Sequence, residues 1–232
     1  MHRNLLRPFH FQRGQQLPPH DYVCRVYFCE GSLAQCCRDE TFLDRILWTD
    51  ESTFTPNGVF NRRNLEQWAD ENPHSVREGA FQYRYTINVW AGLVGNQIGP
   101  VFLPPRLNGN VYAEFLENEL GVLLENVPLK VQKEIIFQHD GAPAHYRWIG
   151  RGEPIAWPPR SPDLTPLDFF LWVHIKNLGE PRRGGTEDEV RNTILESFKS
   201  LTPDMVQKAT RILKRRAEVC LNVKGAHFEQ LL

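Results

Sequence analysis

The sequence has no long hydrophobic run and no strong excess of either charge. No stretch approaches the 18 or so apolar residues that a membrane span needs, and residues 1–8 lack the apolar segment of a secretory signal. We therefore expect no membrane partner. The net charge is -1 over 232 residues, whereas a protein that coats DNA without sequence preference would be strongly basic. Any contact with nucleic acid would therefore have to be local.

Disulfide and zinc signatures are also missing. The 5 cysteines form no CxxC pair, and an odd number argues against a disulfide framework or a cysteine zinc site. We predict reduced thiols in an intracellular protein. Hydrophobic residues make up 41% and charged residues 24%, which are ordinary values for a globular chain and exclude wholesale disorder.

Apolar runs bounded by turn residues predict strands in the first two thirds of the chain. Two of these runs end in an aspartate. Two others are separated by Gly95-Asn96, which is typical of a hairpin. Apolar positions at helical spacing predict one helix before Pro128. The predicted strands are 45–50, 85–94 paired with 98–103, 134–140 and a short candidate at 155–157, and the predicted helix is 111–125.

The last third reads as helical. Thr165 and Thr186 are each followed three residues later by an acid, as in a capping box, and Thr202-Pro203 opens a final helix. Strands followed by helices predict an α/β fold, a mixed sheet flanked by helices with a C-terminal helical segment. At the other end of the chain, six residues predict one apolar helix face interrupted by Gly31: Tyr22, Val23, Val26, Tyr27, Leu33 and Ala34. We interpret that segment as a linker or clamp.

Three aspartates could carry chemistry. Asp50 and Asp140 end apolar strands, and Asp168 lies in the first turn of a predicted helix. If the strands are parallel neighbours, the first two carboxylates meet at one edge of the sheet, and a helix that enters beside them could add the third. Clustered carboxylates need a cation to offset their repulsion. Hard oxygen ligands select Mg²⁺ or Mn²⁺, and two such ions about 4 Å apart suit phosphodiester cleavage. The alternative is that all three are turn and capping residues.

The segment around the second acid also holds histidine, arginine and tryptophan. His139 and His145 lack the helical spacing of a zinc protease, so hydrogen-bonded groups that orient the second acid are the favoured interpretation. Arg147, Trp148 and Arg151 follow on the same loop, where a phosphate backbone would pass if the acids form a site. The alternative for the arginines is a solvated surface.

Four sequence blocks, in order, resemble the signature blocks of mariner-like DDE transposases. The resemblance covers nearly the whole chain from about residue 3, including the closing Gly225-Ala226-His227-Phe228. The blocks are WTDES at 48–52, NVWAG at 88–92, QHDGAPAH at 138–145 and SPDLTPLD at 161–168.

This resemblance implies a ribonuclease H-like catalytic domain that cuts and joins DNA. It places the family's three acids on Asp50, Asp140 and Asp168 as catalytic residues and metal ligands for two Mg²⁺ or Mn²⁺ ions, with Asp163 as a preceding, non-catalytic aspartate. The expected partners are transposon-end and target DNA rather than a small-molecule substrate, together with a second copy of the chain as a homodimer. The expected location is the nucleus.

Two departures from the family pattern shape the expected domains. Residues 1–40 match a linker or clamp remnant where the family carries paired helix-turn-helix modules, so we expect weak sequence-specific binding. Asp168 follows Asp140 by only 28 positions (168 − 140), and Gly141, Pro143 and Gly150 are among the residues that deny this gap a normal helix. We interpret this as a crossover helix deleted near 146–147 of the catalytic domain at 41–180. C-terminal helices at 181–232 would pack on that domain.

Three hypotheses follow. The leading one is a transposase catalytic domain for metal-dependent strand cleavage and strand transfer, with impaired activity. The first rival is a catalytically inactive, domesticated or decayed remnant that keeps nucleic-acid or subunit binding. The second is a nuclease that cuts DNA without target choice.

Overall fold

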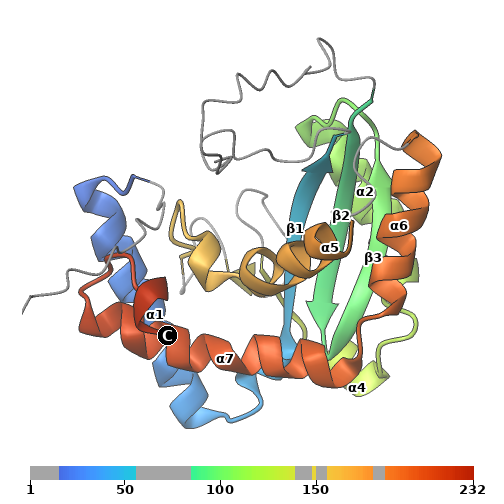
Figure 1. The fold of residues 1–232 in the computed structure, drawn as a ribbon. Helices are drawn as coiled ribbons and strands as arrows, with labels where there is room; N and C mark the ends of the chain where they lie inside the picture. The colour runs from blue at the N-terminus through green and yellow to red at the C-terminus, as the bar shows by residue number, and fades with distance from the viewer. Residues whose placement is uncertain (1–15, 56–84, 139–147, 150–155, 180–185) are drawn as a thin grey trace, which may run out of the picture.

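A five-stranded mixed sheet forms the centre of the protein, in a computed structural model that describes residues 16–55, 85–138, 148–149, 156–179 and 186–232 (Figure 1). The strand order is β3-β2-β1-β4-β5. β1 pairs antiparallel with β2 and parallel with β4, β3 pairs antiparallel with β2, and β5 pairs parallel with β4. The strands are β1 (Ile46–Phe54), β2 (Ile87–Val94), β3 (Asn96–Leu103), β4 (Ile136–Gln138) and β5 (Trp148–Ile149).

The sheet confirms the predicted hairpin and both acid-bearing strands, with changes at their ends. β1 continues four residues past Asp50, and β4 is described only as far as Gln138. The predicted strand at 155–157 is wrong where it can be seen, because residues 156 and 157 have no strand structure. The fifth strand is instead the short β5, which the turn residues around it hid from sequence reasoning.

Side chains alternate across the sheet and build two hydrophobic clusters. Trp48 and Val89 belong to the larger cluster, whereas their chain neighbours Leu47 and Trp90 belong to the smaller one. The larger cluster holds residues of α1, α5, α6 and α7, and the smaller one residues of α2, α3 and α4. The sheet is thus covered on both faces, which explains why β2 is buried along nearly its whole length.

The helices vary from three to 20 residues. None of those described is long and apolar enough to cross a membrane. They are α1 (Pro19–Arg38), η1 (Phe42–Arg45), α2 (Gly109–Asn118), α3 (Leu120–Leu123), α4 (Leu129–Gln132), η2 (Pro162–Leu164), η3 (Leu167–Trp172), α5 (Val173–Gly179), α6 (Glu187–Lys199), α7 (Pro203–Asn222) and η5 (Glu229–Leu231). The predicted helix at 111–125 is divided at Glu119 into α2 and α3.

All three predicted helix starts are confirmed in place, but one of them lacks its side-chain cap. The Thr186 hydroxyl accepts from the amide of Glu189, and the Glu189 carboxylate accepts from the amide of Thr186, which completes a capping box. Thr202 caps α7 by accepting from the amide of Met205. The Thr165 hydroxyl is buried and has no hydrogen-bond partner in the described residues, and the helix after it is wound as a π-helix rather than as the expected α-helix.

Helix α1 runs unbroken through Gly31 and packs against α7 (Figure 1). The predicted apolar face is wrong at three positions, since Val23, Tyr27 and Ala34 are exposed. The buried face carries Arg25 and Phe28 instead. Burial of an arginine on this face is possible because it meets a carboxylate from a distant segment, which helical spacing alone does not reveal.

Candidate active site

The first acid, Asp50, lies in the middle of β1, where its backbone pairs with that of Ala91. Its side chain is half-buried. Residues two apart along a strand share a face, so Asp50, Ser52 and Phe54 project to the same side of the sheet. β1 therefore presents a carboxylate and an aromatic ring on one face, four residues apart.

The third acid, Asp168, lies in the first turn of the π-helix η3 and is also half-buried. The amides of Asp168 and Phe169 both donate to the carbonyl of Thr165, at 3.1 and 3.2 Å. π-helical turns are rare in proteins, and those that do occur are frequently found at functional sites. The helix continues as α5, so Asp168, Trp172 and Lys176 follow one another at intervals of four residues.

Contacts with η3–α5 join the helix that carries Asp168 to the carboxylate of Asp50 on β1. The indole Nε1 of Trp172 donates a hydrogen bond of 2.8 Å to Oδ2 of Asp50. Desolvation holds the pKa of Lys176 below its usual value, against the opposing attraction of the carboxylates of Asp168 and Asp50. The ring of Phe54 shields the ammonium group, with Nζ 5.8 Å from the ring centroid, although the lysine side chain as a whole remains exposed. The ammonium group of Lys176 is thus attracted by the carboxylates of both Asp50 and Asp168.

The predicted second acid, Asp140, lies outside the described residues, as do His139, His145, Arg147 and Arg151. Trp148 is described only in its backbone, which lies in β5. β4 brings the chain to within two residues of Asp140, and its last residue, Gln138, pairs with Trp48 of β1.

Side chains hold the end of β4 tightly to β1. The Thr49 hydroxyl donates to the carbonyl of Gln138 at 2.9 Å, and the Gln138 side chain accepts from the amide of Thr49 at 3.2 Å. Both residues are buried. The strand that leads to Asp140 is therefore fixed beside the strand that carries Asp50.

Zinc and disulfide chemistry find no support in the described parts of the chain. No group of three or more His, Cys, Asp or Glu side chains there could hold a metal ion. All five cysteines fall within the described ranges and are free thiols.

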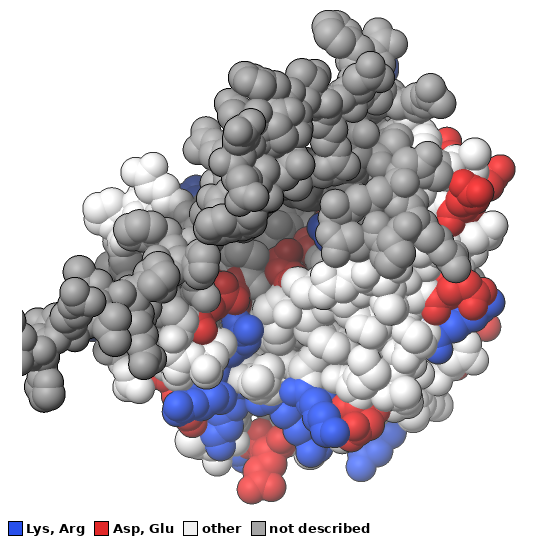
Figure 2. Space-filling model, in the orientation of Figure 1, with Lys and Arg blue, Asp and Glu red and all other residues white. Residues whose placement is uncertain are grey.

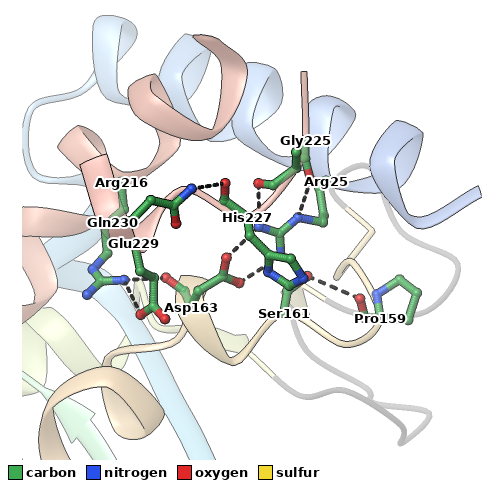
Figure 3. Close-up of polar contacts among 10 residues, drawn as sticks. Arg25, Pro159, Ser161, Asp163, Arg216, Gly225, His227, Glu229 and Gln230 are labelled. Atoms are coloured by element: carbon green, nitrogen blue, oxygen red, sulfur yellow. Dashed lines mark hydrogen bonds and ion pairs between the residues drawn. The ribbon is translucent and has the colours of Figure 1, made fainter. Parts of the chain in front are cut away.

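A buried ion pair anchors the segment that leads to Asp168 (Figure 3). Both terminal nitrogens of Arg25, on α1, donate to the carboxylate of Asp163, at 2.7 and 2.5 Å, and Nη1 also donates to the Ser161 hydroxyl at 2.9 Å. Nε donates to the carbonyl of Gly225 at 2.7 Å. Burial lowers the pKa of Arg25, but the bonds and charge of Asp163 outweigh this and raise it, so the guanidinium stays charged.

The backbone of Gly225 lies very close to the backbone of Tyr22 on α1, which only a glycine allows. Its φ is +82°, and an added Cβ would lie 2.3 Å from the carbonyl oxygen of Tyr22. Asp163, the first aspartate of the SPDLTPLD block, thus joins its own segment to α1 and, through Arg25, to the segment of Gly225, which the sequence alone did not predict. The network positions η2, which directly precedes the turn that carries Asp168.

Surface charge is balanced by local pairing. Basic side chains gather along the lower edge of the face in Figure 2, the edge along which α7 runs in Figure 1. On α7, Lys208 pairs with Asp204 and Arg211 with Asp44. Such pairing leaves little net positive charge to attract DNA from a distance.

Trp172 and Lys176 are the site residues that sequence reasoning missed. The available signal was their spacing of four and eight residues after Asp168, which places all three on one helix face. An aromatic residue at such a spacing is usually interpreted as part of the hydrophobic core, and Trp172 does belong to the larger hydrophobic cluster. Its polar contact with Asp50 depends on long-range packing.

The amino-acid sequence is similar to those of two transposases and of one methyltransferase. No family model matches the chain. It is 26% identical over 220 residues to human histone-lysine N-methyltransferase SETMAR, covering 88% of this chain and 31% of that protein. It is 23% identical over 193 residues to the Tcb1 transposase of Caenorhabditis briggsae and 25% over 199 residues to the Tc3 transposase of Caenorhabditis elegans, covering 68% and 56% of those proteins. The chain therefore spans about a third of SETMAR.

Solved structures give the same result for the fold. The Mos1 mariner paired-end complex with Mn superposes with a TM-score of 0.78 at 22% identity, over 98% of this chain and 69% of that chain. The Mos1 mariner catalytic domain superposes with a TM-score of 0.70 at 21% identity, over 94% and 100% of the two chains. The predicted ribonuclease H-like fold and the predicted resemblance to mariner-like transposases are both confirmed.

Proposed function

From this similarity to mariner-like transposase catalytic domains, we propose that the chain cleaves DNA strands and transfers them to a target with the help of divalent metal ions. The observation that carries the proposal is the hydrogen bond that Trp172, a residue of the helix that carries Asp168, donates to the carboxylate of Asp50 on β1. Asp50 comes from β1 and Asp168 from η3, and both act electrostatically on Lys176. Carboxylates gathered in this way need a positive partner, which a metal ion supplies in addition to the lysine.

The donor set fits a hard cation. Asp50 and Asp168 offer carboxylate oxygens, the ligands that Mg²⁺ and Mn²⁺ prefer, and we propose Asp140 as the third ligand. Its support is its place in the sequence, two residues after β4, which is hydrogen-bonded to β1. When bound, two such ions activate water or a DNA 3′-hydroxyl and stabilise the leaving oxygen.

The remaining predicted site residues stay proposals on their sequence positions. Arg147, Trp148 and Arg151 would contact the DNA backbone by charge and stacking, and His139 and His145 would orient the second acid. Transposon-end and target DNA are the proposed partners, together with a second copy of the chain. Because the proposed substrate is DNA, we also propose a nuclear location.

Metal-dependent nicking tests the proposal. We expect the purified chain with Mn²⁺ to convert supercoiled plasmid to the open circle, slowly if the short gap between Asp140 and Asp168 impairs the site. Asp50→Ala, Asp140→Ala and Asp168→Ala should each abolish nicking. Asp188→Ala is the matched control, because Asp188 is also in the first turn of a helix but is exposed.

The outcomes separate the three hypotheses. Nicking that survives all three substitutions would refute the proposed site. Salt-sensitive DNA binding without any nicking would favour the inactive remnant. Nicking without joining of a pre-cleaved transposon end to a target plasmid would favour a nuclease.

A further inference from the structure

The contact between Trp172 and Asp50 does more than fill space. The Trp172 side chain is 3% exposed, and its Nε1 lies 2.8 Å from Oδ2 of Asp50. A buried indole N–H usually finds a partner, but the partner need not be a predicted metal ligand. The indole of Trp90 donates to the hydroxyl of Tyr112 at 3.2 Å. The buried indole nitrogen of Trp48 has no partner in the described residues.

Packing fixes the direction of this donor. The Trp172 ring meets the ring of Phe54 edge to face, with centroids 6.3 Å apart and planes inclined at 70°. Phe54 lies on the same face of β1 as Asp50. The strand therefore supplies both the acceptor of the indole N–H and the ring against which the indole rests, so the indole has little freedom to turn away.

The bond also restrains the carboxylate. An ionised carboxylate has about four lone-pair sites, and the indole uses one of them. A hydrogen bond from a rigid donor holds the carboxylate plane in one orientation, which leaves its other lone pairs in fixed directions. Hydrogen-bond partners of metal-ligating side chains commonly act in this way, and their loss weakens metal affinity about 10- to 100-fold.

The donor and the third acid belong to one π-helical turn. Asp168 and Trp172 are both residues of η3, which is joined to β1 at its last residue, Trp172, through this hydrogen bond. A shift of η3 along the sheet would move the Asp168 carboxylate and withdraw the donor from Asp50 at the same time. The spacing of the two carboxylates is thus tied to the orientation of one of them.

On the basis of the proposed metal site, we infer that Trp172 is a positioning residue, which orients the Asp50 carboxylate toward a divalent cation and couples its position to that of Asp168. A role in packing alone would require only the ring. A role in positioning requires the N–H.

The test is Mn²⁺ affinity, measured by calorimetry on the DNA-free protein. Trp172→Phe keeps an aromatic ring and loses the N–H, and we expect it to weaken Mn²⁺ binding about tenfold or more. Trp90→Phe is the matched control, because it removes a second buried indole N–H bond from the other face of the sheet. Its Mn²⁺ affinity should equal that of the wild type.

A second variant covers the case in which Trp172→Phe fails to fold. Benzothienylalanine introduced at position 172 keeps the bicyclic shape and replaces the N–H by sulfur, so it should show the same loss of affinity. Wild-type affinity in either folded variant would overturn the inference.

Two further variants separate this inference from the proposed function. If Asp50→Ala and Asp168→Ala abolish Mn²⁺ binding while Trp172→Phe does not change it, the metal site stands and only the positioning role is lost. If the wild type binds no Mn²⁺ at these acids, both the site and the positioning role are refuted.

Discussion

Removal of Asp163 tests how the segment before the candidate site is held. The Arg25 side chain is 0% exposed and that of Asp163 is 8% exposed, and two hydrogen bonds join them. Asp163→Ala leaves the buried guanidinium with the Ser161 hydroxyl and the Gly225 carbonyl but without its hydrogen-bonded carboxylate. Removing one partner of a buried ion pair costs about 3–5 kcal/mol of unfolding free energy.

Thermal unfolding followed by circular dichroism measures this loss. For a chain of this size about 1 kcal/mol corresponds to about 2–4 °C, so we expect Asp163→Ala to lower Tm by about 6–20 °C. Asp204→Ala is the matched control, because it removes an exposed pair with Lys208, which is worth about 0.2–1 kcal/mol. Its Tm should change by less than about 4 °C.

The double variant Arg25→Met with Asp163→Leu separates an unpaired charge from a lost contact. Removing both charges removes the desolvation penalty, so the double variant should be more stable than Asp163→Ala. The Gly225 carbonyl then lacks its donor, which costs about 1–3 kcal/mol, so recovery should be incomplete. A Tm for Asp163→Ala within the range of the control, or a double variant no more stable than Asp163→Ala, would refute the reasoning.

Three shorter predictions follow from other contacts. A thiol reagent added to the native protein should modify the accessible Cys37 and, more slowly, the half-buried Cys24; the three remaining cysteines are buried and should react only after unfolding, and equal reactivity of all five would contradict the structure. Thr186→Ala should lower the unfolding free energy by about 0.5–2 kcal/mol in a denaturant titration, because it removes the cap of α6, whereas Thr186→Asn should keep most of it. The hydrogen bond from Arg160 lowers the pKa of Asp21 below its usual 3.8, so the ionised carboxylate stabilises the fold fully above pH 3.8 and loses this effect as the pH falls through the lowered pKa. The difference in stability between the wild type and Asp21→Asn should therefore shrink as the pH falls below 3.8. A difference that grows with acid would be contrary evidence.

Features that depend on neighbouring residues were predictable from the sequence. The hairpin of β2 and β3 and the cap at Thr186 were predicted because turn and capping chemistry acts within a few residues. The cap at Thr165 was predicted on the same pattern and is wrong. The π-helical turn that follows it changes which groups Thr165 can reach, and no short-range pattern in the sequence indicates a π-helix.

Features that depend on distant partners were not predictable. The buried face of α1 was assigned to apolar residues, whereas its centre is Arg25, which is stabilised by Asp163 from far along the chain. The role of Trp172 was missed for the same reason, since its acceptor Asp50 lies on β1. The acids were proposed because two of them follow apolar runs in the sequence and all three match blocks that resemble those of a known family, but the groups that contact them could not be predicted in this way.

A crystal structure of the chain grown with Mn²⁺ tests the central claim most directly, through the anomalous scattering of the metal. The account predicts an anomalous peak in contact with carboxylate oxygens of both Asp50 and Asp168, with Asp140 as a further ligand. Saturating Mn²⁺ that leaves these carboxylates without a bound ion, or that binds only elsewhere on the protein, would contradict it.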